Sequence, residues 1–168
     1  MKYKKIVLFI LFLVNFSCAS SQTSPASDCS SEFNKVGIRD FEVGISLQDL
    51  KKKNPLLVLK QINDDVDLYD DYMFKEYAKI NGLDKEVIYY FNVQEGMVLS
   101  YFFEVEGDIL FFNQLAEKLK DGKFVDLKKA ERKYYFFEKN NFCYKYFRLK
   151  IKTKEKMVIT GGLSHSNL

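Results

Sequence analysis

Apolar and polar residues alternate along much of this chain, which predicts a domain rich in β-strands. Between residues 97 and 106 every second side chain points the same way, the two-residue period of a strand with one buried face; the apolar positions are Met97, Leu99, Tyr101, Phe103 and Val105. Similar stretches predict strands at 56–61, 66–69, 86–92, 123–127, 133–138, 142–151 and 156–160. Asn140-Asn141, between two of these strands, is typical of a hairpin turn.

Two segments instead have helical features. Ser46 can cap a short helix by accepting a hydrogen bond from an amide two or three residues on, and Asn54-Pro55 ends that helix. A longer helix is expected after Asp108, ending at Gly122. Its apolar stripe contains Ile109, Phe112, Leu115, Ala116 and Leu119.

The order helix, strands, helix, strands predicts an α+β fold. We expect an antiparallel sheet of about six to eight strands with both helices packed on one face. The same order is what a diverged tandem repeat of one helix plus a meander predicts. The globular domain is expected over residues 35–162 as a single unit, followed by a C-terminal tail at 163–168.

The N-terminus is typical of an export signal. Residues 1–5 are basic, residues 6–14 are an unbroken apolar run, and Cys18 follows closely. This arrangement resembles a bacterial lipoprotein signal, which implies a signal peptide at 1–17, lipidation of Cys18 and anchoring to a membrane of the cell envelope, facing the periplasm. The alternative is a secretory peptide cut after Ser21, which would leave a secreted soluble protein. Residues 18–34 are rich in serine and predict a flexible tether.

The leader also accounts for the net positive charge of the chain. The full sequence has 26 basic and 23 acidic residues, and loss of Lys2, Lys4 and Lys5 with the signal leaves 23 of each. The mature protein is therefore neutral overall, and its charge gives no reason to expect nucleic-acid binding. Charge is nevertheless segregated: residues 40–121 have 17 acidic and 9 basic side chains, whereas residues 122–168 have 4 acidic and 12 basic. Either the two halves complement each other internally or they form separate docking faces.

Two cysteines remain once Cys18 is assigned to lipidation. In an oxidising compartment Cys29 and Cys143 can form a disulfide, and their even number favours this over two unpaired thiols. A metal site is not expected, because His165 is the single histidine and no Cys-x-x-Cys spacing occurs. No cofactor is expected either.

At the level of element order the chain resembles the β-lactamase-inhibitor-like fold of small envelope lipoproteins, including outer-membrane assembly lipoproteins. The shared features are Gly44-Ile45-Ser46 at the start of the first helix and the order of a helix followed by strands. The Gly-x-Pro that usually ends the first helix in that family is replaced here by Asn54-Pro55. The resemblance implies an antiparallel sheet covered on one face by helices.

An acidic strip at residues 64–71 is the densest charge feature. If it is a strand, its outer face presents Asp65, Asp67, Tyr69 and Asp71. A calcium loop is disfavoured because the glycine and the distal glutamate of that motif are missing. The strip can instead dock a basic partner, or it can be a solvated edge that charge keeps soluble.

A second candidate surface lies in the predicted strand at 142–151. Alternation places Cys143, Phe147, Leu149 and Ile151 on one face and Tyr144, Tyr146 and Arg148 on the other. Exposed tyrosine beside arginine is enriched at protein interfaces, so these three residues are candidates for protein binding. The alternatives are contact with anionic lipid headgroups, or a strand face that is partly covered and partly solvated.

Catalytic motifs are not evident. Ser164 and His165 are neighbours in the sequence but do not by themselves indicate a catalytic triad, and the Gly-x-Ser-x-Gly motif is absent. Glu104 and Glu106 are the only residues that suggest a catalytic carboxylate pair. We therefore expect a protein that is not an enzyme and that binds another protein, either as an immunity-type inhibitor of an exported toxin or as an envelope assembly factor. The alternative function is binding of a small apolar ligand or lipid in an aromatic-lined cavity between helix and sheet.

Overall fold

The computed structural model describes residues 30–62, 70–119, 125–129, 132–138, 143–151 and 157–165. Its first part consists of a 3-10 helix η2 (Phe33–Val36), strand β1 (Ile45–Ser46), helix α2 (Leu47–Lys53) and strands β2 (Lys60–Gln61), β3 (Asp70–Ile80), β4 (Leu83–Gln94) and β5 (Met97–Glu106). Its second part consists of helix α3 (Ile109–Leu119) and strands β6 (Val125–Lys129), β7 (Arg132–Glu138), β8 (Cys143–Ile151) and β9 (Met157–His165).

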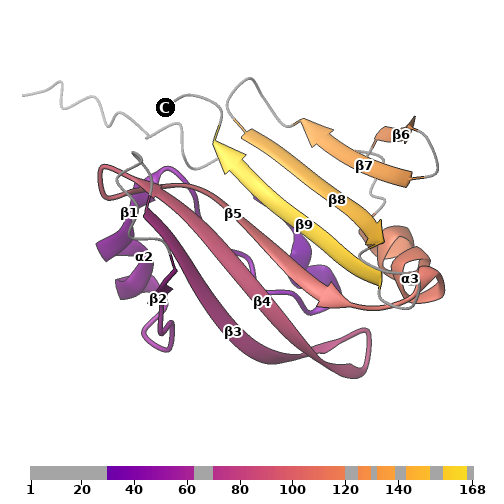
Figure 1. The fold of residues 1–168 in the computed structure, drawn as a ribbon, viewed down its shortest axis with the longest axis horizontal. Coiled ribbons are helices and arrows are strands. Elements are labelled where there is room, and N and C mark those ends of the chain that lie inside the picture. Colours follow the sequence, from indigo (N-terminus) through magenta and orange to yellow (C-terminus); the bar gives the residue numbers. More distant parts are fainter. Residues whose placement is uncertain are drawn as a thin grey trace, which may run out of the picture.

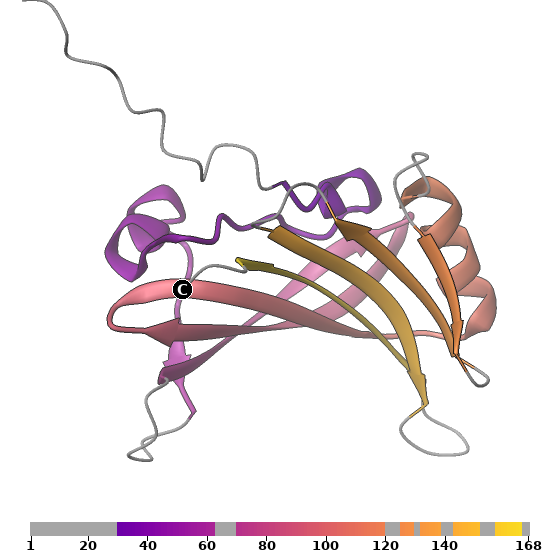
Figure 2. The same ribbon diagram turned by 90° about the horizontal axis from the view of Figure 1, so that it is seen from above.

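All strands belong to one antiparallel sheet with the order β2-β3-β4-β5-β9-β8-β7-β6, and β1 pairs with β5 beside this path. Seven of the strands are long, and β1 and β2 have two residues each. The helices lie on one face of the sheet, and Figure 1 looks onto the opposite face (Figures 1 and 2). The predicted α+β class, with an antiparallel sheet and two helices, is confirmed.

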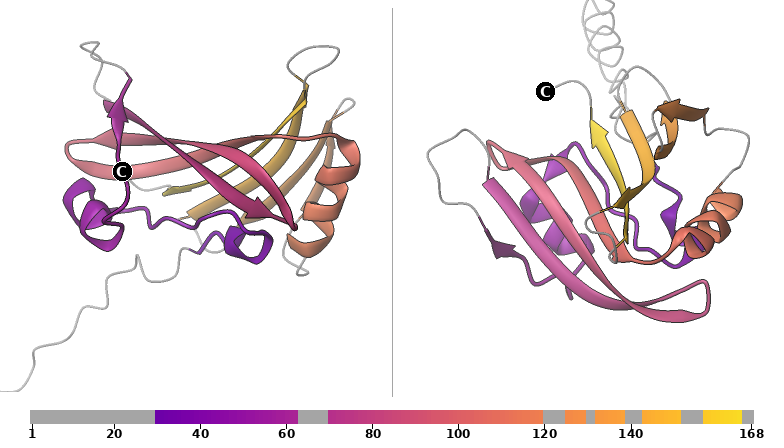
Figure 3. Two further views of the ribbon diagram at one scale, coloured as in Figure 1. Left: turned by 90° about the horizontal axis from the view of Figure 1, so that it is seen from below. Right: turned by 45° about the vertical axis from the view of Figure 1, so that its right-hand side comes forward.

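The element order is the one that a helix-plus-meander repeat predicts. Helix α2 precedes the meander β2-β3-β4-β5, and helix α3 precedes the meander β6-β7-β8-β9. The two meanders join through their last strands, where β5 pairs with β9 over seven residue pairs from Ser100 to Glu106. The acidic and basic halves of the sequence therefore lie side by side in one sheet (Figure 3).

Both helices begin as the sequence predicts. The Asp49 amide donates to Ser46 Oγ at 3.0 Å, and the Phe111 amide donates to Asp108 Oδ1 at 2.8 Å. The apolar stripe of α3 differs at its start, since Phe111 is buried whereas Ile109 is exposed. The Phe112 ring stacks on Phe147 of β8 at 5.0 Å, which joins α3 to the sheet.

Strand β5 departs from strict alternation at its beginning. Val98 pairs with Val93 and Asn92 pairs with Ser100, so Leu99 has no opposite residue and forms a bulge. As a result Val98 is buried together with Tyr101 and Phe103, whereas simple alternation places Val98 on the outer face. After the bulge, Tyr101, Phe103 and Val105 are buried, as alternation predicts.

Two predicted boundaries also differ. Residues 30–34, predicted as tether, belong to the domain, because Phe33 is fully buried and its ring meets Phe103 edge-on at 5.0 Å. Strand β9 continues to His165 and includes the start of the predicted tail.

Strand β3 is an element that the sequence does not predict, because Glu76 interrupts its apolar alternation. In the structure Glu76 is paired with Arg39 at 2.7 Å, and it accepts a hydrogen bond from the Tyr89 hydroxyl. These two partners explain how a carboxylate occupies a position that alternation reserves for an apolar side chain.

Candidate protein-docking surface

The sheet face opposite the helices has an aromatic row that crosses four strands. Tyr90 on β4 pairs with Phe102 on β5, Phe102 pairs with Gly162 on β9, and Gly162 pairs with Tyr146 on β8. The rings of Tyr90 and Phe102 stack at 4.6 Å with an interplanar angle of 17°. A Cβ atom on Gly162 would lie 2.8 Å from Tyr146 Cε1 and 3.0 Å from Phe102 Cβ, so these side chains crowd over the glycine. We call this side of the sheet the uncovered face.

A charged row runs parallel to the aromatic row. Thr160 on β9 pairs with Glu104 on β5 and with Arg148 on β8. The Arg148 guanidinium lies 5.5 Å from the centre of the Tyr146 ring, a cation-π distance. Burial raises the pKa of Tyr146 to about 12, with Arg148 acting to lower it and Glu104 to raise it. Within the described part of the chain, Arg148 Nε and Thr160 Oγ1 are buried without a hydrogen-bond partner.

The predicted face of β8 exists as a continuous surface. Tyr144, Tyr146 and Arg148 all lie on the uncovered face, while Cys143 and Phe147 are buried beneath it, as alternation predicts. Tyr144 is 48% exposed. The role of the three residues in binding stays a prediction.

The structure brings one end of the acidic strip onto this same face. Asp71 pairs with Asn92, and the row continues through Ser100 and Ser164 to Tyr144. The Asn92 amide donates to Asp71 Oδ1 at 3.2 Å. Two candidate surfaces that are far apart in the sequence therefore share one face, about 19 Å apart at the usual strand spacing. Asp65, Asp67 and Tyr69 lie outside the described residues.

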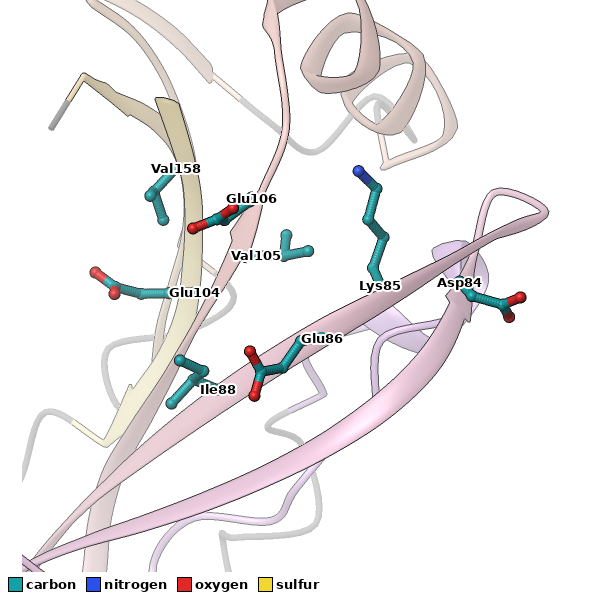
Figure 4. Close-up of a pocket in the computed structure, with 8 residues that line it drawn as sticks. All are labelled: Asp84, Lys85, Glu86, Ile88, Glu104, Val105, Glu106 and Val158. Carbon is teal, nitrogen blue, oxygen red and sulfur yellow. The ribbon is translucent and has the colours of Figure 1, made fainter. Parts of the chain in front are cut away.

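A hollow of about 280 Å³ opens at one end of the uncovered face, where β4 and β5 separate. Figure 4 shows the carboxylates of Glu86, Glu104 and Glu106 around the space beside Ile88 and Val158. Lys75 reaches Glu86 at 3.7 Å. The lining combines four acidic groups and one cation, Lys85, with aliphatic walls, so its excess of negative charge suits an alkyl stem that ends in a cation.

A second group of ionisable side chains lies under the helix-covered face. Lys145 on β8 is 1% exposed, and its Nζ lies 3.2 Å from the Ser30 carbonyl oxygen and 3.4 Å from Glu32 Oε2. Asp40 accepts hydrogen bonds from the Ser31 hydroxyl and from the Phe33 amide. Burial raises the pKa of Asp40 despite the backbone hydrogen bonds and Lys145, which lower it.

The buried cluster of Lys145, Glu32 and Asp40 attaches the segment of residues 30–43 to the sheet. The Tyr101 hydroxyl, fully enclosed between the layers, donates to Ser31 Oγ at 2.7 Å, and burial raises the pKa of Tyr101. The aromatic rings around the cluster fill the space between the layers. Phe41, for example, lies within 5.3 Å of three other ring centres, those of Tyr89, Phe91 and Tyr101. Binding of a small apolar ligand between helix and sheet stays a prediction, and no contact here specifically favours it.

Cys143 is buried at the start of β8, on the helix-covered side. Cys29 lies outside the described residues, so the predicted bridge between them stays a prediction. The next residue, Ser30, accepts a hydrogen bond from Lys145, which is two residues from Cys143. The N-terminal end of the described chain thus lies close to Cys143, as the bridge requires.

Neither a metal cluster nor a spanning helix is found in the described part of the chain. There, no group of three or more Cys, His, Asp or Glu side chains could hold a metal ion. The helices of the same part are too short or too polar to cross a membrane. The predicted leader and Cys18 lie outside the described residues.

Comparison with known proteins gave no relative. No family model, no curated protein and no solved structure matches this chain. The residues themselves therefore provide the evidence on function.

Sequence reasoning missed two parts of this architecture. The aromatic row was not recognised, although the alternation of Phe102 and Glu104 with Phe103 and Val105 already separates the two faces of β5. Lys145 was not recognised as buried, although it falls between Cys143 and Phe147 on the apolar face of its strand. Its burial depends on Glu32 and Ser30, and no local pattern shows that these residues approach it.

Proposed function

We propose that this protein is an exported, lipid-anchored protein of the cell envelope that is not an enzyme and that binds another protein through its uncovered sheet face. The supporting observation is the composition of that face. An aromatic row of Tyr90, Phe102 and Tyr146 lies beside Arg148 and Glu104, and none of the helices among the described residues covers it (Figure 1). Aromatic residues and arginine are the residue types that contribute most to protein-binding energy.

The position of Ser30 agrees with this role. Ser30 lies against Lys145 on the helix-covered side, and the predicted anchor at Cys18 is N-terminal to it. The attachment to the membrane therefore starts from the side opposite the uncovered face. The tether predicted between Cys18 and Ser30 would span up to about 40 Å when extended, which would leave the uncovered face accessible to a protein partner in the periplasm.

Two roles fit a binding module of this kind. An immunity-type inhibitor would cover the active site of an exported toxin, and the acidic positions Asp71, Glu104 and Glu106 favour a toxin with a basic cleft. An envelope assembly factor would hold a partner during its insertion or maturation. Both roles use the same surface and differ in the identity of the protein bound.

The experiment that tests the proposal is photocrosslinking in intact cells. A photoreactive amino acid replaces Tyr144, which is 48% exposed on the uncovered face, and a control variant has it at Leu110, which is 63% exposed on α3. We expect defined protein adducts from position 144 and none of the same mass from position 110. Adducts with lipid alone, or identical adducts from both positions, would contradict the proposal.

A further inference from the structure

The uncovered face has a regular arrangement of side chains around β9. Each outward residue of β9 has a neighbour on β5 and another on β8, and the four rows are Ser100-Ser164-Tyr144, Phe102-Gly162-Tyr146, Glu104-Thr160-Arg148 and Glu106-Val158-Lys150. The central residues are small or medium-sized. In three of the four rows the two flanking residues are complementary. One row joins two aromatic residues, and each of two rows joins an acidic residue to a basic residue.

This arrangement makes the face complementary to itself. Rotation of a second copy by 180° about an axis parallel to β9 exchanges its β5 and β8 positions while keeping each row in place. Glu104 then faces Arg148 of the second copy, Glu106 faces its Lys150, and Phe102 faces its Tyr146. We propose that the protein occupying the uncovered face is a second copy of this chain, which forms a symmetric dimer with the two sheets packed face to face. This inference rests on the proposed function, in which the uncovered face docks a protein.

The dimer would bring the flanking side chains of the two copies into contact. Sheets that pack face to face lie about 10 Å apart, close enough for outward side chains to meet. Arg148 Nε and Thr160 Oγ1 are already buried in the single copy, so the dimer contacts of this row would come from the accessible parts of the Glu104 and Arg148 side chains. Lys150 of the second copy would lie opposite Glu106, at the hollow of about 280 Å³ that also has Glu86 and Glu104 in its lining (Figure 4).

Pairing through the edge of the sheet is less favourable for two copies. Strand β3 extends well beyond its short pairing with β2, which ends at Met73. Antiparallel pairing of two β3 strands about Tyr77 would place Lys75 of each copy opposite Lys79 of the other, and like charges in that position are destabilising. Lysines on an edge strand are a usual means of preventing such pairing. The lysines of β3 thus oppose edge-to-edge pairing in this register, whereas the charges of the uncovered face are arranged to favour a face-to-face dimer.

Exchange of two charges tests the proposal. Glu104→Arg and Arg148→Glu are purified as full chains, and their association is measured by analytical ultracentrifugation in density-matched detergent. Each variant alone should dissociate with a Kd at least about tenfold higher than that of the wild type, because both interfacial pairs become repulsive. An equimolar mixture of the two variants should form a heterodimer, since each interfacial pair would then again join one acidic and one basic side chain. Glu117→Arg, an exposed change on α3, is the matched control and should leave association unchanged.

A cysteine on the symmetry axis gives a test that does not depend on the folding of the charge variants. Ser164 lies in the central column, so it would face Ser164 of the second copy. Ser164→Cys should form a covalent dimer with a short bismaleimide crosslinker, because the separation between the sheets is too large for a direct disulfide, and Lys79→Cys on β3 should not. A monomeric wild type at about 100 μM, or a mixture of charge variants that stays monomeric, would overturn the dimer.

The photocrosslinks from position 144 separate this inference from the function on which it rests. Adducts of twice the mass of this chain support the symmetric dimer, and they support the proposed function only in its general form, the docking of a protein on the uncovered face. Adducts with a different protein alone retain the protein-binding function and overturn the symmetric dimer. Adducts without any protein overturn both.

Discussion

The two faces of the sheet use the same residue types in different ways. On the helix-covered face, phenylalanine and tyrosine are fully buried and the ionisable groups Lys145, Glu32 and Asp40 are bonded to one another or to the backbone. On the uncovered face, Tyr90, Phe102 and Tyr146 are half-buried, and Glu104 and Arg148 lie in one row. The covered face therefore stabilises the fold, whereas the uncovered face keeps aromatic and charged groups available for binding.

Adjacent residues of β5 provide the most direct test of this difference. Phe103 is fully buried against Phe33 and Tyr89, so Phe103→Ala should lower the free energy of unfolding by about 3–5 kcal/mol. Phe102 stacks on Tyr90 at the surface, and Phe102→Ala should cost only about 1 kcal/mol. Chemical denaturation at a concentration where the chain is monomeric measures both variants. Equal losses of unfolding free energy in the two variants would show that Phe102 is as buried as Phe103 in the monomer.

The buried cation of the covered face should have the next largest effect. Lys145→Met keeps most of the apolar contact but removes the positive charge that Glu32, Asp40 and the Ser30 carbonyl face. We expect a loss of about 2–3 kcal/mol in the free energy of unfolding, because the Ser30 carbonyl and the Glu32 carboxylate lose their partner. Chemical denaturation at neutral pH measures this loss.

The control for this variant is Lys75→Met. Lys75 is half-exposed in its ion pair with Glu86, so its loss should change the free energy of unfolding by less than about 0.5–1 kcal/mol. If the two lysines gave equal effects, the buried cluster would not be what attaches residues 30–43 to the sheet.

The smallest expected effect is a dependence on pH. Burial raises the pKa of Asp40 above its ordinary value of 3.8, so the folded state holds the Asp40 proton more tightly than the unfolded state does. The contribution of Asp40 to stability is therefore greatest at acidic pH, and it decreases as the pH rises from about 4 through the folded-state pKa.

Asp40→Asn should remove this dependence. The difference in unfolding free energy between wild type and variant, measured from pH 3 to pH 7, should shift in favour of the variant as the pH rises. Tyr101→Phe, which removes a buried hydroxyl from the same cluster without a titratable carboxyl, is the control. A pH profile of Asp40→Asn parallel to that of the wild type would contradict the assigned direction of the pKa.

Much of the fold could be predicted because local rules determine it. The Ser46 and Asp108 caps, the alternation in β4 and β8, and the order of helices and strands follow from residues near in the sequence. The faces of Tyr144 and Arg148 followed from the same alternation. Local patterns did not predict the start of β5, where the bulge at Leu99 moves Val98 to the core, or β3, where the partly buried Glu76 pairs with Arg39.

The sequence alone determined which residues of each strand share a face, where the helices begin, and that acidic residues concentrate in one half of the chain and basic residues in the other. Only the tertiary structure decided that β5 pairs with β9, which brings the two halves together and places Glu104, Thr160 and Arg148 in one row. It also decided that residues 30–43 cross the covered face and enclose Lys145. The physical reason is the range of the interactions. Alternation and capping depend on neighbours within a few residues, whereas strand order and the pairing of buried charges depend on contacts between residues that are far apart in the chain.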